Sequence, residues 1–543
     1  LDLIATGRMV GAEEALRIGL VDAIAETDLR REAVALARSL IGQMQPRLSL
    51  QATPAAEPEA WQAMVDRVNH EAKGRIAPLR AIELVSQSLT LAFGVAQANE
   101  RRAFFELMSS DQSLALRHIF SAERETGKRP ELSSARPRDI SHIGIIGAGT
   151  MGSGIAVAFL DAGFRVTLVE ADESALQAGV ERVSGLYQRS IRSGRMDDAT
   201  RVARLALLNP TTEMAKLAET GLVIEAVFED MAIKLELMKQ LGRLLPASTL
   251  VASNTSYLDL EQMADALPGP ERFLGLHFFS PAHVMKLVEV VRARRTSPEA
   301  VATGLAIARK LKKIAVVTGV CEGFIGNRIL AKFRAQCEFM LEEGALPREI
   351  DIAMEGFGLA MGPFAVQDLA GLDIAYARRK RLAATRTPDE RDVPLVDRLV
   401  EEGRLGQKAG RGWYLYDNGK RSADPAVDAI IRMHAAGSGR PQRNFNAADI
   451  QNRIVAAMVN EGAKILGEGI AARAFEIDLV LVHGYGFPAW RGGPMHYADR
   501  VGLKNILSIA KTAAMRDGKG FEVAPLLEDL AQSQRRFADL DAN

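Results

Sequence analysis

A histidine and a glutamate in neighbouring apolar segments are the strongest candidates for proton transfer in this chain. His277 follows the apolar run Phe273-Leu-Gly-Leu, and Glu289 stands inside the run Leu287-Val-Glu-Val-Val. The pKa of histidine lies near neutrality, so an imidazole can take the proton of a hydroxyl group. A carboxylate on its other ring nitrogen would fix the tautomer and stabilise the imidazolium. The alternatives are a core histidine bonded to backbone and a surface glutamate, although a glutamate among apolar neighbours is usually paired.

A glycine-rich turn earlier in the chain predicts a dinucleotide-binding site. An apolar run at residues 143–146, typical of a buried parallel strand, leads into the pattern G-x-G-x-x-G, and a helical pattern follows. The glycines allow a tight turn and close approach of a pyrophosphate, and the helix N-terminus offers free N–H groups. The candidate cofactor-binding residues of this turn are Gly147, Gly149, Thr150, Met151 and Gly152.

The type of dinucleotide follows from an acid at the end of the next apolar run. Residues 165–169 form that run, and Glu170 comes at its end. Glu170 lies about 20 residues after Gly149, which is the spacing expected of an acid that binds the adenosine ribose hydroxyls. Its charge would repel the extra phosphate of NADP, and no arginine follows it, so the pattern favours NAD. The alternative to a dinucleotide-binding site is that the glycine-rich turn is an ordinary strand–helix junction.

Together these features predict an oxidoreductase in which hydride leaves the carbon of an alcohol while a base takes the hydroxyl proton. Further strand-like runs occupy residues 222–229 and 251–256, and each catalytic candidate lies at the end of such a run or inside one. In open α/β sheets, ligands bind outside the carboxyl ends of the strands. We therefore expect an α/β Rossmann domain that carries both the cofactor site and the histidine.

Several longer motifs give the chain a resemblance to a known family, the L-3-hydroxyacyl-CoA dehydrogenases. More closely, it resembles the dehydrogenase part of multifunctional fatty-acid β-oxidation enzymes, both the peroxisomal bifunctional type and the α subunit of the bacterial fatty oxidation complex. The order and spacing of these motifs agree with the family over most of the chain. The motifs are Gly-Ala-Gly-Thr-Met-Gly at 147–152, Glu-Ala-Val-Phe-Glu at 225–229, Ser-Asn-Thr-Ser at 253–256, His-Phe-Phe-Ser-Pro-Ala-His at 277–283 and Gly-Phe-Ile-Gly-Asn-Arg at 323–328.

The resemblance implies a role for each matching residue. His277 is the general base and Glu289 orients it, and the substrate is an acyl-CoA. The family's NAD site includes the matching residues Glu229, Lys234 and Asn254.

Two further polar residues are assigned to the substrate by the same resemblance. Ser256 and Asn327 hydrogen-bond the reacting oxygen or the substrate carbonyl. Each has a structural alternative, because Ser256 could cap the following helix and Asn327 could cap a helix that starts near Arg328.

A set of arginines follows Glu170 in a helical segment, and the CoA moiety is anionic. We expect either a solvated helix face or one or two arginines that hold CoA phosphates. The candidates are Arg182, Arg189, Arg192, Arg195, Arg201 and Arg204.

Composition excludes several other classes of protein. The 543 residues include 68 basic and 68 acidic side chains, so the basic excess expected of a nucleic-acid-binding protein is absent. The sequence has no apolar run of about 20 residues that would span a membrane. Cys321 and Cys337 form neither a metal-ligand spacing nor a disulfide framework, which favours a reducing compartment. With no signal peptide and no C-terminal Ser-Lys-Leu, we expect a bacterial cytoplasmic protein.

The chain divides into segments of different character. Residues 3–25 are similar to the tail of a crotonase (enoyl-CoA hydratase) domain, so the chain is interpreted as N-terminally truncated, without a hydratase site. We expect this remnant to pack against the linker or to be poorly ordered. A Pro- and Ala-rich stretch at 46–60 opens that linker. The predicted domains are a crotonase remnant at 1–45, a helical linker at 46–137, the NAD-binding Rossmann domain at 138–321, and all-α dehydrogenase domains at 322–436 and 437–543.

The two C-terminal domains are predicted from an internal repeat. Two helical copies would bury their apolar faces against each other, which replaces a dimer interface and allows a monomer. Because the second copy lacks a Rossmann partner, Asn452 is expected to cap a helix and not to contact substrate. The matched pairs are Asn327-Arg-Ile with Asn452-Arg-Ile, Glu343-Gly344 with Glu468-Gly469, Ile350-Asp351 with Ile477-Asp478, Phe357-Gly358 with Tyr485-Gly486, and Gly362-Pro363 with Gly493-Pro494.

The leading functional prediction is NAD-dependent oxidation of L-3-hydroxyacyl-CoA to 3-ketoacyl-CoA in fatty-acid β-oxidation. One alternative is short-chain 3-hydroxybutyryl-CoA chemistry in the reductive direction, and another is a bifunctional hydratase–dehydrogenase in the untruncated parent. A non-enzymatic NAD-binding protein is disfavoured by the joint presence of His277, Glu289, Ser256 and Asn327. The resemblance also suggests a thiolase subunit as partner, and both a monomer and a small oligomer stay open.

Overall fold

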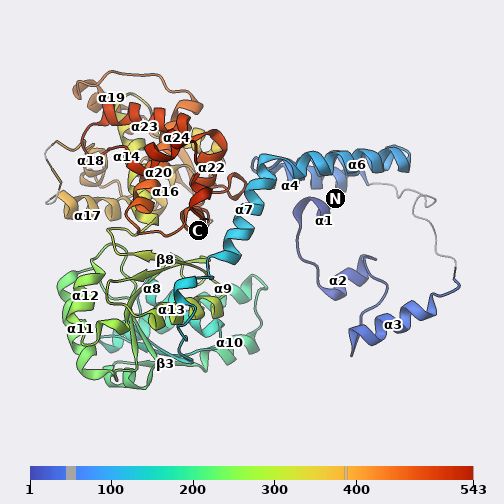
Figure 1. Ribbon diagram of the computed structural model, residues 1–543, viewed down its shortest axis with the longest axis horizontal. Coiled ribbons are helices and arrows are strands. Elements are labelled where there is room, and N and C mark those ends of the chain that lie inside the picture. The colour runs from blue at the N-terminus through green and yellow to red at the C-terminus, as the bar shows by residue number, and fades with distance from the viewer. Residues whose placement is uncertain (44–56, 384–385, 388, 542–543) are drawn as a thin grey trace. The chain divides into compact units, whose positions relative to one another are not determined.

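The computed structural model describes residues 1–43, 57–383, 386–387 and 389–541, which fall into two compact units, Leu1–Leu114 and Ala115–Asn543 (Figure 1). The first unit is helical. The second contains a large sheet and the C-terminal helices. Most of the predicted linker at 46–60 lies outside the described residues, and a helix begins at Pro58 within it.

The helices of the first unit share a small core. Ala5, Val68 and Ala81 meet there, so the first helix packs on the helices that follow residue 57, one of the two outcomes expected for this segment. The third helix buries no side chain. The helices are α1 (Asp2–Thr6), α2 (Ala12–Arg17), α3 (Leu29–Ser39), α4 (Pro58–Ala72), α5 (Ile76–Thr90) and α6 (Phe93–Met108), and α7 (Asp111–Glu125) begins in this unit and ends in the next.

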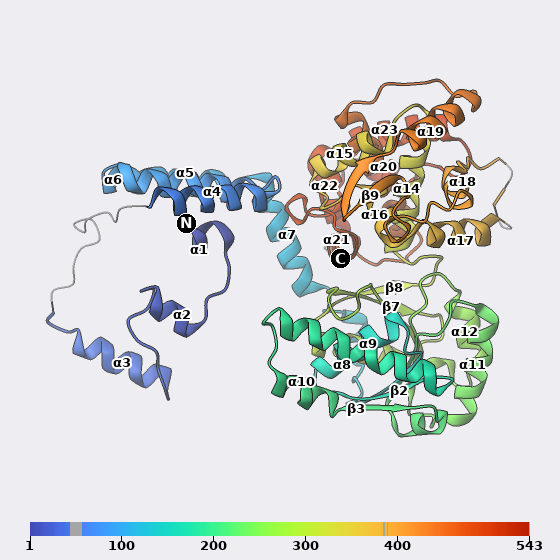
Figure 2. The same ribbon diagram turned by 180° about the vertical axis from the view of Figure 1, so that it is seen from behind.

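The sheet of the second unit has the order β3-β2-β1-β4-β5-β6-β7-β8. The first six strands of this order run parallel, as in a Rossmann fold, whereas β7 pairs antiparallel with β6 and β8 follows β7 in parallel. Figures 1 and 2 show β8 at the edge beside the C-terminal helices and β3 at the far edge. The strands are β1 (His142–Ile146), β2 (Arg165–Val169), β3 (Leu208–Thr211), β4 (Leu222–Glu225), β5 (Leu250–Ser253), β6 (Phe273–Phe278), β7 (Leu287–Arg292) and β8 (Ile314–Gly319).

Helices cover both faces of this sheet, which explains the nearly continuous apolar strands in the sequence. On one face α8, α9 and α13 bury side chains such as Phe159, Val183 and Val301. On the other face α11 and α12 bury Met238 and Met263. The helices are α8 (Thr150–Asp161), α9 (Glu173–Arg192), α10 (Asp198–Leu205), α11 (Met231–Leu244), α12 (Leu260–Ala266) and α13 (Pro298–Lys310).

The rest of the unit is a helical bundle with one hairpin, so the predicted all-α segment also contains two short antiparallel strands. One continuous core joins helices from α14 to α24. The elements are α14 (Gly326–Glu342), α15 (Pro347–Phe357), α16 (Pro363–Ala370), α17 (Leu372–Ala383), α18 (Leu395–Glu401), β9 (Tyr414–Asp417), β10 (Lys420–Ala423), α19 (Pro425–Gly437), α20 (Ala447–Gly467), α21 (Ala474–Tyr485), α22 (Pro494–Val501), α23 (Leu503–Asp517) and α24 (Pro525–Ser533).

The predicted duplication is confirmed, and a buried aspartate marks each copy. Asp351 accepts hydrogen bonds from Phe364 and Ala365 at the start of α16, and Asp478 accepts them from Met495 and His496 at the start of α22. These carboxylates satisfy N–H groups that a helix start leaves free. The long first helices of the two copies, α14 and α20, pack directly on each other.

One detail of the repeat prediction is wrong. Asn452 lies inside α20 and is exposed, whereas Asn446 caps that helix by accepting a hydrogen bond from the backbone N–H of Asp449. The helix starts earlier because Asn446 and Asp449 form a reciprocal capping box.

Candidate active site

The pairing of β6 with β7 brings His277 and Glu289 together. The two residues are direct partners in the antiparallel register, and the His277 Nδ1 lies 2.6 Å from Glu289 Oε2. His277 is 4 % exposed and Glu289 is 0 % exposed. Both alternatives, a backbone-bonded core histidine and a surface glutamate, are therefore wrong. Because a carboxylate only accepts hydrogen bonds, Nδ1 carries the proton and Nε2 is the free base in neutral His277.

The second oxygen of Glu289 faces the first turn of α14. Oε1 accepts hydrogen bonds from the backbone N–H groups of Ile325 and Gly326, at 3.2 and 3.1 Å. The positive end of the helix dipole and two donors stabilise the carboxylate in this buried place. The C-terminal helices thus fix the orientation of the carboxylate that orients His277.

Ser256 faces the basic nitrogen of His277. Its Oγ lies 3.2 Å from Nε2, at the loop that follows β5. The helix-cap alternative is wrong, because Asp259 caps α12. Glu229 holds the same loop, since its Oε1 accepts hydrogen bonds from the Thr255 hydroxyl and from the Ser256 N–H. Ser256 and His277 therefore frame one point at the carboxyl ends of β5 and β6, where a hydroxyl group could be bound and deprotonated.

Lys234 is buried and paired with an acid that the sequence did not single out. Its Nζ donates to both carboxylate oxygens of Glu225 at 2.8 and 2.7 Å, and Glu229 Oε2 lies 3.5 Å away. The Ser253 hydroxyl also contacts Glu225. The sequence could have indicated this pair, because Glu225 is the acid at the end of an otherwise apolar strand and Lys234 lies on the helix that follows.

Asn327 lies in the first turn of α14, which is capped at Ile325, so it does not cap a helix. Its Oδ1 accepts a hydrogen bond of 2.9 Å from the hydroxyl of Tyr485, at the end of α21 in the second copy. Among the described residues, the amide N–H groups of Asn327 have no acceptor. The ring of Tyr485 packs on Phe279, which in turn contacts the His277 imidazole. The sequence did not reveal Tyr485, whose counterpart in the first copy is Phe357.

The Tyr485 hydroxyl is expected to hold the Asn327 amide with its N–H groups available to a substrate oxygen. Tyr485→Phe should lower kcat by about 3–10-fold, the value of one hydrogen bond, with a smaller effect on KM. In an Asn327→Ala background the same change should have no further effect, because the hydroxyl acts through the amide. Steady-state kinetics of the four enzymes would measure this coupling. Tyr497→Phe on α22 is the control, and independent losses in the double variant would contradict the idea.

The glycine-rich turn has the geometry that a dinucleotide requires. Gly147 has φ +96°, and a Cβ at Gly152 would lie 1.7 Å from the Gly147 carbonyl oxygen. A Cβ at Gly149 would meet nothing within 4 Å, so the backbone there is open to a ligand. Thr150 and Met151 begin α8, whose N-terminus has no side-chain cap. A pyrophosphate fits this open helix N-terminus.

Two more residues that are predicted to bind the cofactor lie beside this turn and at the ends of the strands. Glu170 directly follows β2. Its Oε1 accepts a hydrogen bond of 2.6 Å from the Ala148 N–H, which leaves further lone pairs for ribose hydroxyls. Asn254 follows β5, and its Oδ1 accepts from the Phe278 N–H at 2.9 Å. Asn254 therefore ties the ends of β5 and β6 together beside His277.

Several of the arginines proposed for CoA have partners within the protein. Arg182 donates to the Ala148 carbonyl at 2.7 Å, Arg201 pairs with Asp198, and Arg204 donates to the Leu160 carbonyl. These three bind the protein itself.

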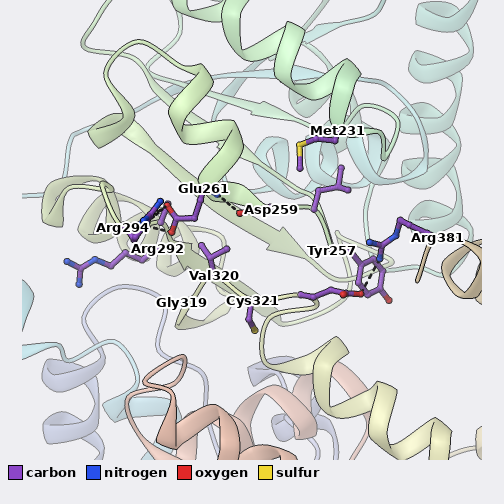
Figure 3. A pocket seen from close by; sticks show the side chains of 13 residues that line it. Met231, Tyr257, Asp259, Glu261, Arg292, Arg294, Gly319, Val320, Cys321 and Arg381 are labelled. Atoms are coloured by element: carbon purple, nitrogen blue, oxygen red, sulfur yellow. Dashed lines mark hydrogen bonds and ion pairs between the residues drawn. The ribbon is translucent and has the colours of Figure 1, made fainter. Parts of the chain in front are cut away.

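A large cavity of about 920 Å³ opens beside the link between the sheet and the C-terminal helices (Figure 3). Two of its arginines are paired: Arg294 lies 3.3 Å from Glu261, and Arg381 lies 3.3 Å from Glu322 and over the ring of Tyr257. Arg292, which also lines the cavity, forms no ion pair within the described residues. Neither His277 nor Glu289 lines it.

A mostly buried acid on α14, Glu338, predicts a pH effect on stability. Burial raises the pKa of Glu338 from 4.5 to about 7, and the attraction of Arg379 and Arg334 offsets only part of this. Because the folded pKa is raised, the stabilisation by the protonated form is complete below pH 4.5 and is lost as the pH rises through 7.

Glu338→Gln should consequently become more stable relative to wild type between pH 5 and pH 8, by at most about 3 kcal/mol. Melting temperatures of both proteins across this range would measure the change. Parallel curves would show that Glu338 does not titrate as described.

No helix in the described part of the chain is long and apolar enough to cross a membrane. No group of three or more His, Cys, Asp or Glu side chains in that part is arranged to hold a metal ion. Cys321 and Cys337 are free thiols.

Comparisons with known proteins agree with this geometry. Residues 142–321 match the family 3-hydroxyacyl-CoA dehydrogenase, NAD binding domain, and residues 323–416 and 450–537 match the corresponding C-terminal domain. The peroxisomal bifunctional enzyme of Danio rerio is 38% identical over 98% of this chain and 76% of its own length. The fatty acid oxidation complex subunit alpha of Psychrobacter sp. (strain PRwf-1) is 32% identical over 99% of this chain and 77% of its own length.

A solved structure shows the same relationship. The dehydrogenase part of multifunctional enzyme 1 from C. elegans is 30% identical and superposes with a TM-score of 0.57, covering 76% of this chain and 96% of that one. The family match spans the Rossmann sheet and both helical copies, which are the parts that hold His277, Glu289 and Tyr485. The chain therefore belongs to the 3-hydroxyacyl-CoA dehydrogenase family, in the branch of multifunctional β-oxidation enzymes.

Proposed function

We propose that this enzyme interconverts L-3-hydroxyacyl-CoA and 3-ketoacyl-CoA with NAD, with His277 as the general base. The observation that carries the assignment is the buried His277–Glu289 pair, whose free Nε2 faces Ser256 at the carboxyl ends of the strands. The relative from Psychrobacter is named as a subunit of a fatty acid oxidation complex, and we infer fatty-acid β-oxidation as the setting of this chain. The catalyst accelerates both directions equally, so the site itself sets no direction.

The cofactor supplies the acceptor for a hydride, and the chain supplies its position. Gly147, Gly149 and Gly152 would let the pyrophosphate reach the N-terminus of α8, and Glu170 would accept hydrogen bonds from the ribose hydroxyls. Asn254, which ties the end of β5 to β6 beside His277, would hold the nicotinamide end of the cofactor. Repulsion of a 2′-phosphate by Glu170 selects NAD over NADP.

On the substrate side, each polar group has a separate task. Ser256 and the Asn327 amide bind the reacting oxygen or the thioester carbonyl, and His277 Nε2 takes the hydroxyl proton as the hydride leaves C3. Glu289 stabilises the resulting imidazolium, and the N–H groups of Ile325 and Gly326 hold the carboxylate in place. Phe279 and Phe324, whose rings flank His277, keep bulk water from the base.

The direct test is the consumption of NADH with acetoacetyl-CoA as substrate, followed by absorbance. We expect turnover with NADH and at least about 10-fold lower kcat/KM with NADPH, and the preference should fall in Glu170→Ala because the repelling charge is removed. Binding of NADH without turnover of any 3-ketoacyl-CoA would contradict the proposed function.

A further inference from the structure

The first helices of the two copies, α14 and α20, pack on each other and are joined by the same ion pair formed twice (Figure 2). Arg328 of the first copy donates through both terminal nitrogens to Glu468 of the second, at 2.5 and 2.8 Å. Arg453, the match of Arg328 in the repeat, donates in the same way to Glu343, the match of Glu468, at 2.8 and 3.0 Å. Reciprocal contacts of this kind are typical of an interface between two equivalent units.

The surroundings of the two pairs differ. Arg453 and Glu343 lie in a buried network with Gln336 and Asp517. In the described part of the chain, no hydrogen bond or ion pair joins Arg453 or Glu343 to a residue of the candidate active site. Their pair therefore has a structural role in the bundle.

Arg328, in contrast, lies in the first turn of α14, beside the reacting groups. Asn327 directly precedes it in this turn. The backbone N–H groups of Ile325 and Gly326, at the start of the same turn, hold the Oε1 atom of Glu289. A shift of the turn would consequently displace both the carboxylate that orients the base and the amide that faces the substrate.

The two helices also begin in different ways. α20 starts with its own capping box, formed by Asn446 and Asp449. α14 begins after Ile325 without a side-chain cap of its own, and Glu289 from β7 accepts two of its free N–H groups instead. The place of Glu289 is therefore tied to the place of this helix start, and the second copy has no such link.

The turn that supplies these donors is strained. Gly323 and Phe324 both have positive φ, +78° and +49°. This conformation is unfavourable for phenylalanine and persists only where the surroundings hold the backbone. The backbone N–H of Arg328 closes the turn on the Gly323 carbonyl at 3.2 Å. The Arg328 side chain is in turn fixed by Glu468 and by Glu461 on α20, the latter at 2.6 Å, so the second copy anchors the strained turn.

We propose that Arg328 is a positioning residue for the dehydrogenase reaction, because its ion pairs with the second copy hold the first turn of α14 against Glu289. Arg328 acts through Glu289 and Asn327 and takes no part in the chemistry itself. The second copy thereby serves catalysis as the anchor of the first. This inference rests on the proposed function, since it assigns a role in the same reaction.

The test compares Arg328→Lys with Arg453→Lys, the same change at the matched position. Lysine keeps the positive charge but cannot form the two-armed contact. Arg328→Lys should lower kcat with acetoacetyl-CoA and NADH by about 10–100-fold, because small displacements of positioned groups have large effects on rate. Its KM for NADH should stay within about twofold of wild type, since the glycine-rich turn is unchanged. Arg453→Lys should lower the melting temperature at least as much and keep kcat within about twofold of wild type.

Glu468→Gln provides a second variant that is expected to fold, because the Glu468 side chain is about half exposed. The change lies in the second copy, yet kcat should fall by about 3–10-fold, the value of one charge-assisted hydrogen bond, while the melting temperature stays close to that of wild type. Combined with Arg328→Lys it should add little to the loss, because both changes act on one contact.

The outcomes separate this inference from the proposed function. Wild-type kcat in Arg328→Lys, or an equal loss of kcat in Arg328→Lys and Arg453→Lys, would overturn the positioning role and leave the dehydrogenase assignment intact. A rise in KM for NADH parallel to the loss of kcat would show general damage and would overturn it as well. If Arg328→Lys does not fold, an unchanged kcat in Glu468→Gln refutes the role. If wild type reduces no 3-ketoacyl-CoA, the proposed function fails and the positioning role fails with it.

Discussion

Glu289→Gln is expected to reduce kcat by about 10³–10⁴-fold while NADH still binds. The Ile325 and Gly326 N–H groups would hold the amide oxygen of the new side chain, which turns its NH₂ group toward His277 Nδ1. An NH₂ donor there requires Nδ1 as acceptor and places the proton on Nε2. The imidazole would then have no free nitrogen facing Ser256, so the base is lost although the geometry is kept.

The same experiment with His277→Gln should give a loss of similar size, and the double variant should be little worse than either single one, because the two residues act as a unit. Turnover is measured with acetoacetyl-CoA and NADH, and cofactor binding by NADH fluorescence. Glu271→Gln, at an exposed acid of the same domain, is the control. Retention of more than a tenth of wild-type kcat in Glu289→Gln would show that His277 works without this carboxylate.

Lys234→Met is expected to have the largest effect on stability, a loss of about 3–5 kcal/mol in the free energy of unfolding. Lys234 is 1 % exposed and is bonded to both oxygens of Glu225, which is itself fully buried. Removal of the cation leaves this carboxylate buried with only the Ser253 hydroxyl and the Val227 N–H as donors. The variant should also lose activity, since Glu225 and Glu229 support the loops beside the cofactor site.

Two further variants distinguish charge from packing in this prediction. Lys239→Met changes an exposed lysine of the same helix and should alter the free energy of unfolding by less than about 0.5 kcal/mol. The double change Lys234→Met with Glu225→Gln should recover part of the loss, because no unpaired charge is left. Thermal or urea unfolding would measure all four proteins. If the double variant is no more stable than Lys234→Met, the unpaired carboxylate is not the cause.

The amino-acid sequence determined the parts of the site that depend on short-range patterns. The apolar run, the three glycines and Glu170 specify the strand, turn, helix and second strand of the cofactor site, because each of these elements is fixed by the spacing of residues within a short window. His277 and Glu289 were recognisable for a similar reason, since a titratable residue inside an apolar strand must be satisfied by a partner. The helical repeat was also visible, as the same motifs recur in the same order.

Only the tertiary structure decided which partner each polar side chain has. Ser256 was equally consistent with a helix cap, and the proximity of β5 to β6 assigned it to His277. Asn327 binds Tyr485, 158 residues away, because the packing of α14 against α21 of the second copy places these groups together. Hydrogen bonds and ion pairs act over a few ångströms in space, whereas sequence patterns report neighbours along the chain. A contact made by packing two distant helices is therefore set by the summed burial of many apolar side chains, and no local motif records it.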